Sequence, residues 1–285
     1  MTMHTWEAIR FVRCALADAA ITPTADLEAK LLVERATSLS PTELVTKRDR
    51  LLTAEEEKAL KGLLSERLGY TPMAYILGHR EFYGLDFLVD RRVLIPRADT
   101  ETLVETVRKT VRPSPSLRLL DLCTGSGCVG ITLSLLLGCP VTLADISEDA
   151  LCVAKENAER LCKMPFTIVQ SDLFSHITGT FDIIVSNPPY LSSQWITEAD
   201  EQVRKEPLLA LDGRGNDGLS IIRRLITQAR RYLEAKSKLF IECDDRQIVT
   251  VKQLLLANGF VNVYSEKDLS GQERIARGEL SCTTS

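Results

Sequence analysis

The stretch that decides the fold reads Asp121-Leu122-Cys123-Thr124-Gly125-Ser126-Gly127-Cys128-Val129-Gly130. It joins an apolar segment at 118–122 to an apolar segment at 127–137 that is long enough for a helix. Its glycines follow the spacing G-x-G-x-x-G, which lets a chain turn tightly between strand and helix and lets a ligand approach the backbone. About 20 residues further on, Asp145 ends the next apolar segment, where a carboxylate can accept hydrogen bonds from ribose hydroxyls. The stretch therefore predicts a nucleoside-binding loop in an open α/β sheet.

Strand and helix signals alternate from residue 117 onward. We expect strands at 118–122, 141–144, 166–170, 181–186, 238–242 and 261–265, and helices at 127–137, 149–161, 218–233 and 245–258. Repeated strand–helix units build a mostly parallel sheet with helices on both faces.

The residues before this region have a different pattern. Apolar residues recur at helical spacing in the first 78 residues, and Ser40–Glu43 and Thr53–Glu56 carry the capping-box pattern of helix starts. Aromatic and β-branched residues around Gly84 then predict a hairpin, followed by a helix at about 99–111 and a proline-serine break at 112–116. We therefore expect a helical domain at 1–78, a hairpin and linker helix at 79–115, and an α/β domain at 116–285.

Composition narrows the class of protein. The chain has 285 residues, of which 45% are hydrophobic, and a net charge of −4, and the whole acidic excess lies after residue 115. No cluster of Lys and Arg indicates direct nucleic-acid binding. No apolar run is long enough to cross a membrane, and the charged N-terminal stretch is unlike a signal peptide, so we expect a cytoplasmic protein.

The cysteines and histidines lack the spacing of a metal site. No C-x-x-C pair occurs, and the three histidines are scattered. We expect no metal and free or buried thiols in a reducing compartment. The cysteines in question are Cys14, Cys123, Cys128, Cys139, Cys152, Cys162, Cys243 and Cys282.

A second motif, Asn187-Pro188-Pro189-Tyr190, directly follows the predicted strand 181–186. An amide nitrogen is a poor nucleophile because its lone pair is delocalised. The Asn187 side-chain oxygen and the Pro188 carbonyl can accept hydrogen bonds from its N–H groups and direct the lone pair toward a methyl donor, while the Tyr190 ring stacks on the planar group. Catalysis then rests on positioning and electrostatics. We predict Asn187, Pro188 and Tyr190 as catalytic residues and the whole motif, including Pro189, as substrate-binding.

The glycine loop taken alone would also fit NAD. A dinucleotide needs helix-terminus amides that face a pyrophosphate, whereas S-adenosylmethionine carries an ammonium and a sulfonium, which the preceding acid Asp121 suits better. No catalytic His, Tyr or Lys for hydride transfer is evident near the strand ends. We therefore expect S-adenosylmethionine as the cofactor.

Together these features resemble the class I N-methyltransferases, through the glycine loop, Asp145, the turn Ser171–Phe174 and Asn187–Tyr190. The chain also resembles the release factor glutamine methyltransferases over most of its length. This resemblance lies in the helical N-terminal domain and in four segments, Ile95–Glu101, Glu206-Pro207, Asp217–Leu219 and Asp268–Arg274. The resemblance implies a Rossmann-like, mostly parallel sheet with a small helical N-terminal domain. It also implies N5-methylation of the glutamine in the Gly-Gly-Gln motif of peptide chain release factors.

The same resemblance assigns roles to single residues. Asp145 is expected to hold the ribose, and Asp172 and Leu173 to border the adenine. Asn187 to Tyr190 are expected to grip the glutamine amide, with Asn187 also contacting the cofactor. The segment around Arg97 either closes over the cofactor or is a plain interdomain linker. The residues expected to line the methionine part are Cys123, Thr124, Gly125, Ser126 and Gly127.

Three alternatives stay open. The sequence Cys-Thr-Gly-Ser-Gly-Cys at 123–128 is similar to a sister family that methylates a glutamine of a large-subunit ribosomal protein, and Ala98 and Asp244 depart from the release factor pattern. Methyltransferases of DNA or RNA exocyclic amines use the same turn but need a basic face. A non-enzymatic adaptor would not bind S-adenosylmethionine. We expect a monomer that uses its helical domain, 1–78, to hold release factors as protein substrates.

Overall fold

The computed structural model describes residues 3–281, which form two compact units. A helical unit comprises residues 3–78 together with 200–205, and an α/β unit comprises 79–199 together with 206–281. The hairpin and helix expected as a linker, 79–115, belong to the same compact unit as the sheet.

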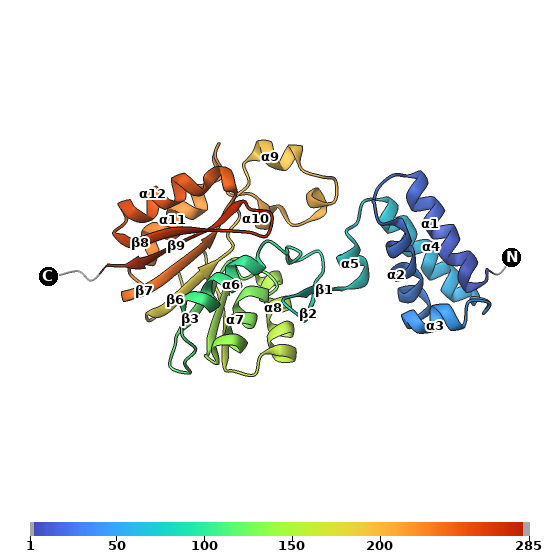
Figure 1. The fold of residues 1–285 in the computed structure, drawn as a ribbon, viewed down its shortest axis with the longest axis horizontal. Coiled ribbons are helices and arrows are strands. Elements are labelled where there is room, and N and C mark those ends of the chain that lie inside the picture. Colours follow the sequence, from blue (N-terminus) through green and yellow to red (C-terminus); the bar gives the residue numbers. More distant parts are fainter. Residues whose placement is uncertain (1–2, 282–285) are drawn as a thin grey trace. The chain divides into compact units, whose positions relative to one another are not determined.

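The helical unit contains α1 (Thr5–Asp18), α2 (Ala25–Thr37), α3 (Pro41–Thr46), α4 (Ala54–Leu68) and α5 (Met73–Leu77), with the short 3₁₀ turn η1 at Val203–Lys205 (Figure 1). Val12, Leu32 and Leu60 are fully buried in its core. Both expected capping boxes are confirmed, since the side chains of Ser40 and Thr53 accept hydrogen bonds from backbone N–H groups three residues later.

The α/β unit is built on a seven-stranded sheet (Figure 1). The hairpin β1 (His79–Phe82) and β2 (Leu85–Leu88) precedes it. The strands of the sheet are β3 (Leu119–Leu122), β4 (Val141–Asp145), β5 (Phe166–Gln170), β6 (Phe181–Ser186), β7 (Leu233–Glu242), β8 (Phe260–Lys267) and β9 (Glu273–Leu280). The helices are α6 (Glu101–Thr110), α7 (Cys128–Leu137), α8 (Glu148–Leu161), α9 (Ser193–Glu198), α10 (Leu208–Leu211), α11 (Ser220–Ala229) and α12 (Ile248–Ala257), with the 3₁₀ turn η2 (Asp245–Gln247).

The strands lie in the order β5-β4-β3-β6-β7-β9-β8. The pairs among β3, β4, β5, β6 and β7 are parallel, and β9 pairs antiparallel with both β7 and β8. The expected mostly parallel sheet is therefore confirmed. The bounds of β5 and β6 agree with the expected strands, whereas β7 begins five residues before the expected Lys238.

The last strand, β9, is not among the strands expected from the sequence. Its residues Glu-Arg-Ile-Ala-Arg-Gly-Glu-Leu include four glutamate or arginine side chains, at Glu273, Arg274, Arg277 and Glu279, and only three apolar ones. Only Ile275, Ala276 and Gly278 are buried, so the pattern lacks the regular alternation of a half-buried strand. Pairing with β7 and β8, rather than local pattern, makes this segment a strand.

The sheet separates two apolar layers, because successive residues of a strand point to opposite faces. Leu120, Ile184 and Leu239 face a layer that contains α11 and α12. Their neighbours Leu119, Ile183 and Phe240 face a layer that contains α6 and α7. Helices cover both faces (Figure 1), so the central strands are buried on both sides and read as continuous apolar runs.

Candidate active site

The site lies where the order of the strands reverses. After β3 the chain continues to β4 and β5 on one side and later returns to β6 and β7 on the other. Leu122 at the end of β3 pairs with Ser186 at the end of β6, and Ser186 Oγ donates a hydrogen bond to the Leu122 carbonyl at 2.7 Å. Cys123 and Asn187 therefore leave the sheet side by side at its carboxyl edge, which is where open α/β sheets bind ligands.

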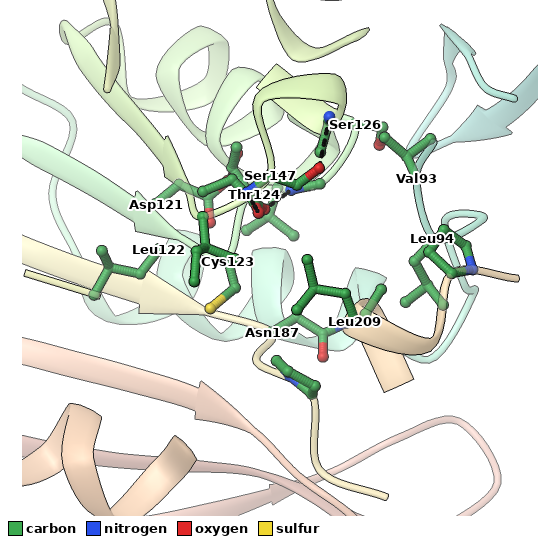
Figure 2. Close-up of a pocket in the computed structure, with 18 of the residues that line it drawn as sticks. Val93, Leu94, Asp121, Leu122, Cys123, Thr124, Ser126, Ser147, Asn187 and Leu209 are labelled. Atoms are coloured by element: carbon green, nitrogen blue, oxygen red, sulfur yellow. Dashed lines mark hydrogen bonds between the residues drawn. The ribbon is translucent and has the colours of Figure 1, made fainter. Parts of the chain in front are cut away.

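A cavity opens at this point and encloses about 1160 Å³, counting the solvent at its mouth. Figure 2 shows Cys123 and Asn187 on neighbouring chain segments, with Val93 and Leu94 across the cavity from Cys123. Leu209 also lines the cavity. The predicted site residues that line it are Cys123, Thr124, Gly125, Ser126, Asp145, Asp172, Leu173, Asn187 and Pro189. Gly127, Pro188 and Tyr190 are not among the lining residues.

Asp121 organises the glycine loop from beneath. Its side chain is buried, and Oδ2 accepts hydrogen bonds from the Thr124 hydroxyl at 2.6 Å and from the Gly130 backbone N–H at 2.9 Å. Burial raises the pKa of Asp121 to about 7, and these two hydrogen bonds oppose the rise. The predicted acid therefore holds the turn in shape, in addition to bordering the cavity.

Gly130 is required by close packing. A Cβ added there would lie 2.4 Å from a methyl carbon of Leu143 and 2.8 Å from the Asp121 side chain. Because glycine has no Cβ, the first turn of α7 can approach β3 and β4 closely enough for the Gly130 N–H to donate its hydrogen bond to Asp121. Close packing of helix against strand is the role that the third glycine has in loops of this kind.

Asp145 ends β4 and holds the same loop from the other side. Its Oδ2 accepts a hydrogen bond from Gly125 N–H, and its Oδ1 accepts one from Ser147 N–H, both at 3.0 Å. Burial raises the pKa of Asp145, and the backbone hydrogen bonds oppose this. Each carboxylate oxygen keeps further lone-pair capacity, so the residue can still accept from vicinal hydroxyls in the cavity.

The adenine side of the predicted site contains Asp172 and Leu173. Arg224 of α11 forms an ion pair with Asp172, with Nη2 to Oδ2 at 2.8 Å, which fixes the direction of this half-exposed carboxylate. Leu173 is buried and lines the cavity. An apolar surface beside a fixed carboxylate suits a flat heterocycle with amino hydrogens.

These residues fit S-adenosylmethionine. Ser126 Oγ lines the cavity, is buried, and has no hydrogen-bond partner within residues 3–281, so a polar ligand atom would satisfy it. Asp121, Asp145 and Asp172 supply the acidic surroundings that a cationic ligand favours. Three arginines also line the cavity, Arg92, Arg97 and Arg214. Arg92 and Arg97 are each paired with an acid, Asp90 and Glu206 respectively.

The Asn187-Pro188-Pro189-Tyr190 turn is anchored by contacts that its sequence did not indicate. Asn187 Nδ2 donates to the Thr100 hydroxyl at 3.1 Å. The Tyr190 hydroxyl donates to Glu242 Oε1 at 3.4 Å, and the Tyr190 carbonyl accepts from Gln247 Nε2 at 2.8 Å. Burial raises the pKa of Tyr190, so it keeps its proton. Hydrogen bonds therefore hold both the backbone and the side chains of this turn in place.

Gly218 allows a second loop to lie directly against this turn. Its φ of +69° is in the left-handed region, and an added Cβ would lie 2.2 Å from the Tyr190 carbonyl oxygen. Gln247 Nε2 also donates to the Asp217 carbonyl at 2.7 Å, which ties the two segments together. The sequence Asp217-Gly218-Leu219, quoted above only for its resemblance, therefore has a packing function.

The Arg97 segment forms part of the cavity wall. Glu206 Oε2 accepts a hydrogen bond from the Ile95 backbone N–H at 3.0 Å, and its other oxygen is ion-paired with the Arg97 guanidinium. Burial raises the pKa of Glu206, and Arg97 opposes this. Ile95 and Pro207 both line the cavity, so one buried carboxylate joins two walls that are far apart in the sequence.

Residues 3–281 contain no group of three or more side chains that could hold a metal ion. No helix among them is long and apolar enough to cross a membrane. Seven cysteines are free thiols, and Cys282 lies outside the described residues.

Two family models match the chain. Residues 7–78 match the model described as PrmC N-terminal domain, and residues 98–205 match the model described as Methyltransferase small domain. The first match covers the helical part of the chain, and the second covers the glycine loop, Asp145 and the Asn187 turn.

Among solved structures, the chain is similar to the 16S rRNA N2 G1207 methyltransferase of T. thermophilus in complex with AdoMet and guanosine. The TM-score is 0.52 at 18% identity, over 71% of this chain and 49% of that chain. At this identity the similarity shows the fold, and it confirms the class I methyltransferase architecture.

Full-length relatives are more similar in sequence. A release factor glutamine methyltransferase of Agrobacterium fabrum is 37% identical over 258 residues, covering 87% of this chain and 88% of the relative. Another of Pseudomonas aeruginosa is 37% identical over 266 residues, covering 91% and 94%. Because both relatives are 37% identical over most of the two chains, and residues 7–78 match the PrmC N-terminal domain, the chain belongs to the family of release factor glutamine methyltransferases.

Proposed function

We propose that this protein transfers a methyl group from S-adenosylmethionine to the side-chain amide nitrogen of the glutamine in the Gly-Gly-Gln motif of a peptide chain release factor. One observation carries the proposal. The glycine loop and Asn187 emerge next to one another from paired strand ends and line the same cavity. The names of the full-length relatives support release factors as the substrate class.

The cofactor is held by the loop and by two acids. The Asp145 carboxylate accepts hydrogen bonds from the ribose hydroxyls, and Asp172 and Leu173 border the adenine. Residues 123–127 surround the methionine part, with the unpaired Ser126 hydroxyl as one polar contact. When bound, S-adenosylmethionine supplies an electrophilic methyl group, and its sulfur keeps the electron pair of the broken S–C bond.

The substrate amide is held by acceptors on the Asn187 turn. Asn187 Oδ1 and the Pro188 carbonyl accept hydrogen bonds from the two N–H groups of the glutamine amide. This holds the nitrogen lone pair toward the methyl group, and the nitrogen releases one proton to water as the N–C bond forms. The protein lowers the barrier by positioning and by fixed dipoles. Stacking of the Tyr190 ring on the amide stays a prediction.

The experiment that tests the proposal is transfer of a labelled methyl group to purified release factor. A second sample carries a release factor whose Gly-Gly-Gln glutamine is replaced by alanine. Label on the first substrate and none on the second is the expected result. Label on a large-subunit ribosomal protein, or on RNA, with none on release factor would reject the proposal and select one of the two alternatives.

A further inference from the structure

The two ends of the Asn187 side-chain amide are not equivalent for catalysis. The oxygen accepts hydrogen bonds and the NH₂ group donates them. A glutamine amide presents N–H groups to Asn187, so only the oxygen end can hold it. Whatever fixes the orientation of this side chain therefore decides whether the site can work.

Thr100 contacts the NH₂ end. It lies immediately before α6, is only 2% exposed, and lines the cavity. Its hydroxyl accepts the hydrogen bond from Asn187 Nδ2 at 3.1 Å. Thr100 is itself held in place, because its backbone N–H donates to the Arg97 carbonyl at 3.1 Å. Arg97 in turn is paired with the buried Glu206.

A hydroxyl can both donate and accept, so a further group must set the direction of this hydrogen bond. That group is Glu242, at the end of β7, which is 2% exposed and whose Oε2 has no hydrogen-bond partner among residues 3–281. Burial raises the pKa of Glu242 to about 7, the Thr100 side chain, Arg274 and Tyr190 oppose this rise, and Asp99 adds to it.

An ionised carboxylate only accepts hydrogen bonds. With Glu242 ionised, the single O–H of Thr100 turns toward this carboxylate, and a lone pair of Thr100 remains for the Asn187 NH₂ group. The Asn187 NH₂ group then donates to the Thr100 hydroxyl, whose own O–H is turned toward the unpaired Glu242 Oε2. The Asn187 oxygen is left facing the cavity.

We propose that Thr100 is a positioning residue, which holds the Asn187 side-chain amide with its oxygen toward the substrate, and that Glu242 sets the direction of the hydrogen bonds. The inference rests on the proposed function, because Asn187 Oδ1 is taken there as the acceptor for the substrate amide. It adds two residues to the site, one immediately before α6 and one at the end of β7, which lie 87 and 55 positions from Asn187 in the sequence.

The central test compares Thr100→Val with Thr100→Ser. Valine has nearly the shape of threonine but no hydroxyl, so Asn187 can turn its NH₂ group toward the substrate. We expect kcat for release factor methylation to fall roughly 10- to 100-fold, as for a misplaced catalytic group. KM for release factor and the affinity for S-adenosylhomocysteine should change less than about threefold. Thr100→Ser keeps the hydroxyl and should retain most of kcat.

Thr106→Val is the matched control. Thr106 lies in α6, the helix that Thr100 precedes, is also buried, and donates its hydroxyl hydrogen to the Thr102 carbonyl within the helix. Its substitution should leave kcat unchanged. A Thr100→Val enzyme with the kcat of the unmodified enzyme would overturn the inference. So would a Thr100→Ser enzyme as impaired as Thr100→Val, because that result would mean a packing role.

A second measurement does not depend on methyl transfer. The side-chain ¹⁵N–H signals of Asn187, assigned by their loss in Asn187→Ala, report the bond to Thr100. We expect one Asn187 amide proton to exchange slowly in the unmodified protein and in Thr100→Ser, and rapidly in Thr100→Val. Unchanged exchange in Thr100→Val would reject the contact. If the unmodified enzyme methylates no release factor, the proposed function fails, and this measurement still decides the contact.

Glu242→Gln tests the direction of the hydrogen bonds. Glutamine has a similar shape but can donate as well as accept, so Thr100 is no longer forced to turn its O–H away from Asn187. We expect kcat to fall severalfold with unchanged affinity for S-adenosylhomocysteine. A fully active Glu242→Gln enzyme would remove the direction-setting role of Glu242.

Discussion

At the scale of single residues, Asn187 carries the largest predicted effect on turnover. Replacing it by alanine removes one of the two acceptors for the substrate amide, and loss of one fixed hydrogen-bond partner at a reacting group costs about 100- to 1000-fold in kcat. We expect Asn187→Ala to bind S-adenosylhomocysteine with nearly unchanged affinity, measured by titration calorimetry. Asn262→Ala on β8, outside the cavity, is the control. An active Asn187→Ala enzyme would exclude the acceptor role.

Two buried acids make the stability of the fold depend on pH. Burial raises the pKa of Asp121 and of Glu242 to about 7, from ordinary values near 4. Both folded-state pKa values lie above the unfolded ones. Their contribution to stability is therefore fully present below about pH 4 and is lost as the pH rises through about 7. For Glu242 the loss is on the order of 3 kcal/mol.

The variant Glu242→Gln isolates this contribution. Denaturant unfolding at pH 5, 6, 7 and 8 should show a smaller decline in unfolding free energy for the variant than for the unmodified protein. Glu159→Gln, on the exposed surface of α8, should follow the unmodified curve. If Glu242→Gln and the unmodified protein declined in parallel, the buried carboxyl would not be the source of the pH dependence.

At the scale of elements, the approach of α7 to β3 and β4 depends on Gly130. In Gly130→Ala the new methyl group would overlap Leu143 and Asp121, and such overpacking costs about 1–3 kcal/mol. We expect a lower Tm and weaker binding of S-adenosylhomocysteine, because the glycine loop is held by the same hydrogen bond to Asp121. Thermal unfolding with and without ligand measures both effects.

Gly62→Ala is the contrasting substitution on a helix. Gly62 lies within α4, and nothing is within 4 Å of an added Cβ. Alanine is favoured over glycine in helices by about 1 kcal/mol, so the helical unit should become more stable. Equal effects of the two substitutions would show that close packing is not what requires glycine at position 130.

At the scale of the whole molecule, we propose that the helical unit serves the protein substrate and the α/β unit serves the cofactor. Every residue that lines the cavity belongs to the α/β unit. Deleting residues 1–78 should therefore raise KM for release factor about tenfold or more, since contacts outside the site are lost, while affinity for S-adenosylhomocysteine stays the same. Loss of cofactor binding on deletion would contradict this division.

The sequence alone determined the parallel part of the sheet, the glycine loop with Asp145, and the place of the Asn187 turn. Each has a local signature. Strands buried on both faces read as apolar runs, tight turns need glycine, and the carboxyl ends of parallel strands meet at one edge. For this reason 181–186, which is buried along most of its length, is predicted with the bounds that the structure has. The edge strand 166–170 is also predicted with its observed bounds, from its β-branched and aromatic residues.

Only the tertiary structure decided which distant residues meet. Glu273–Leu280 is a strand because β7 and β8 pair with it. Thr100, Glu206 and Glu242 reach the site through hydrogen bonds to residues 52 to 111 positions away. Such contacts follow from the order of the strands and from side-chain packing, which leave no pattern in neighbouring residues. The residues that carry the chemistry have local sequence motifs, whereas the residues that orient them are found only in the tertiary structure.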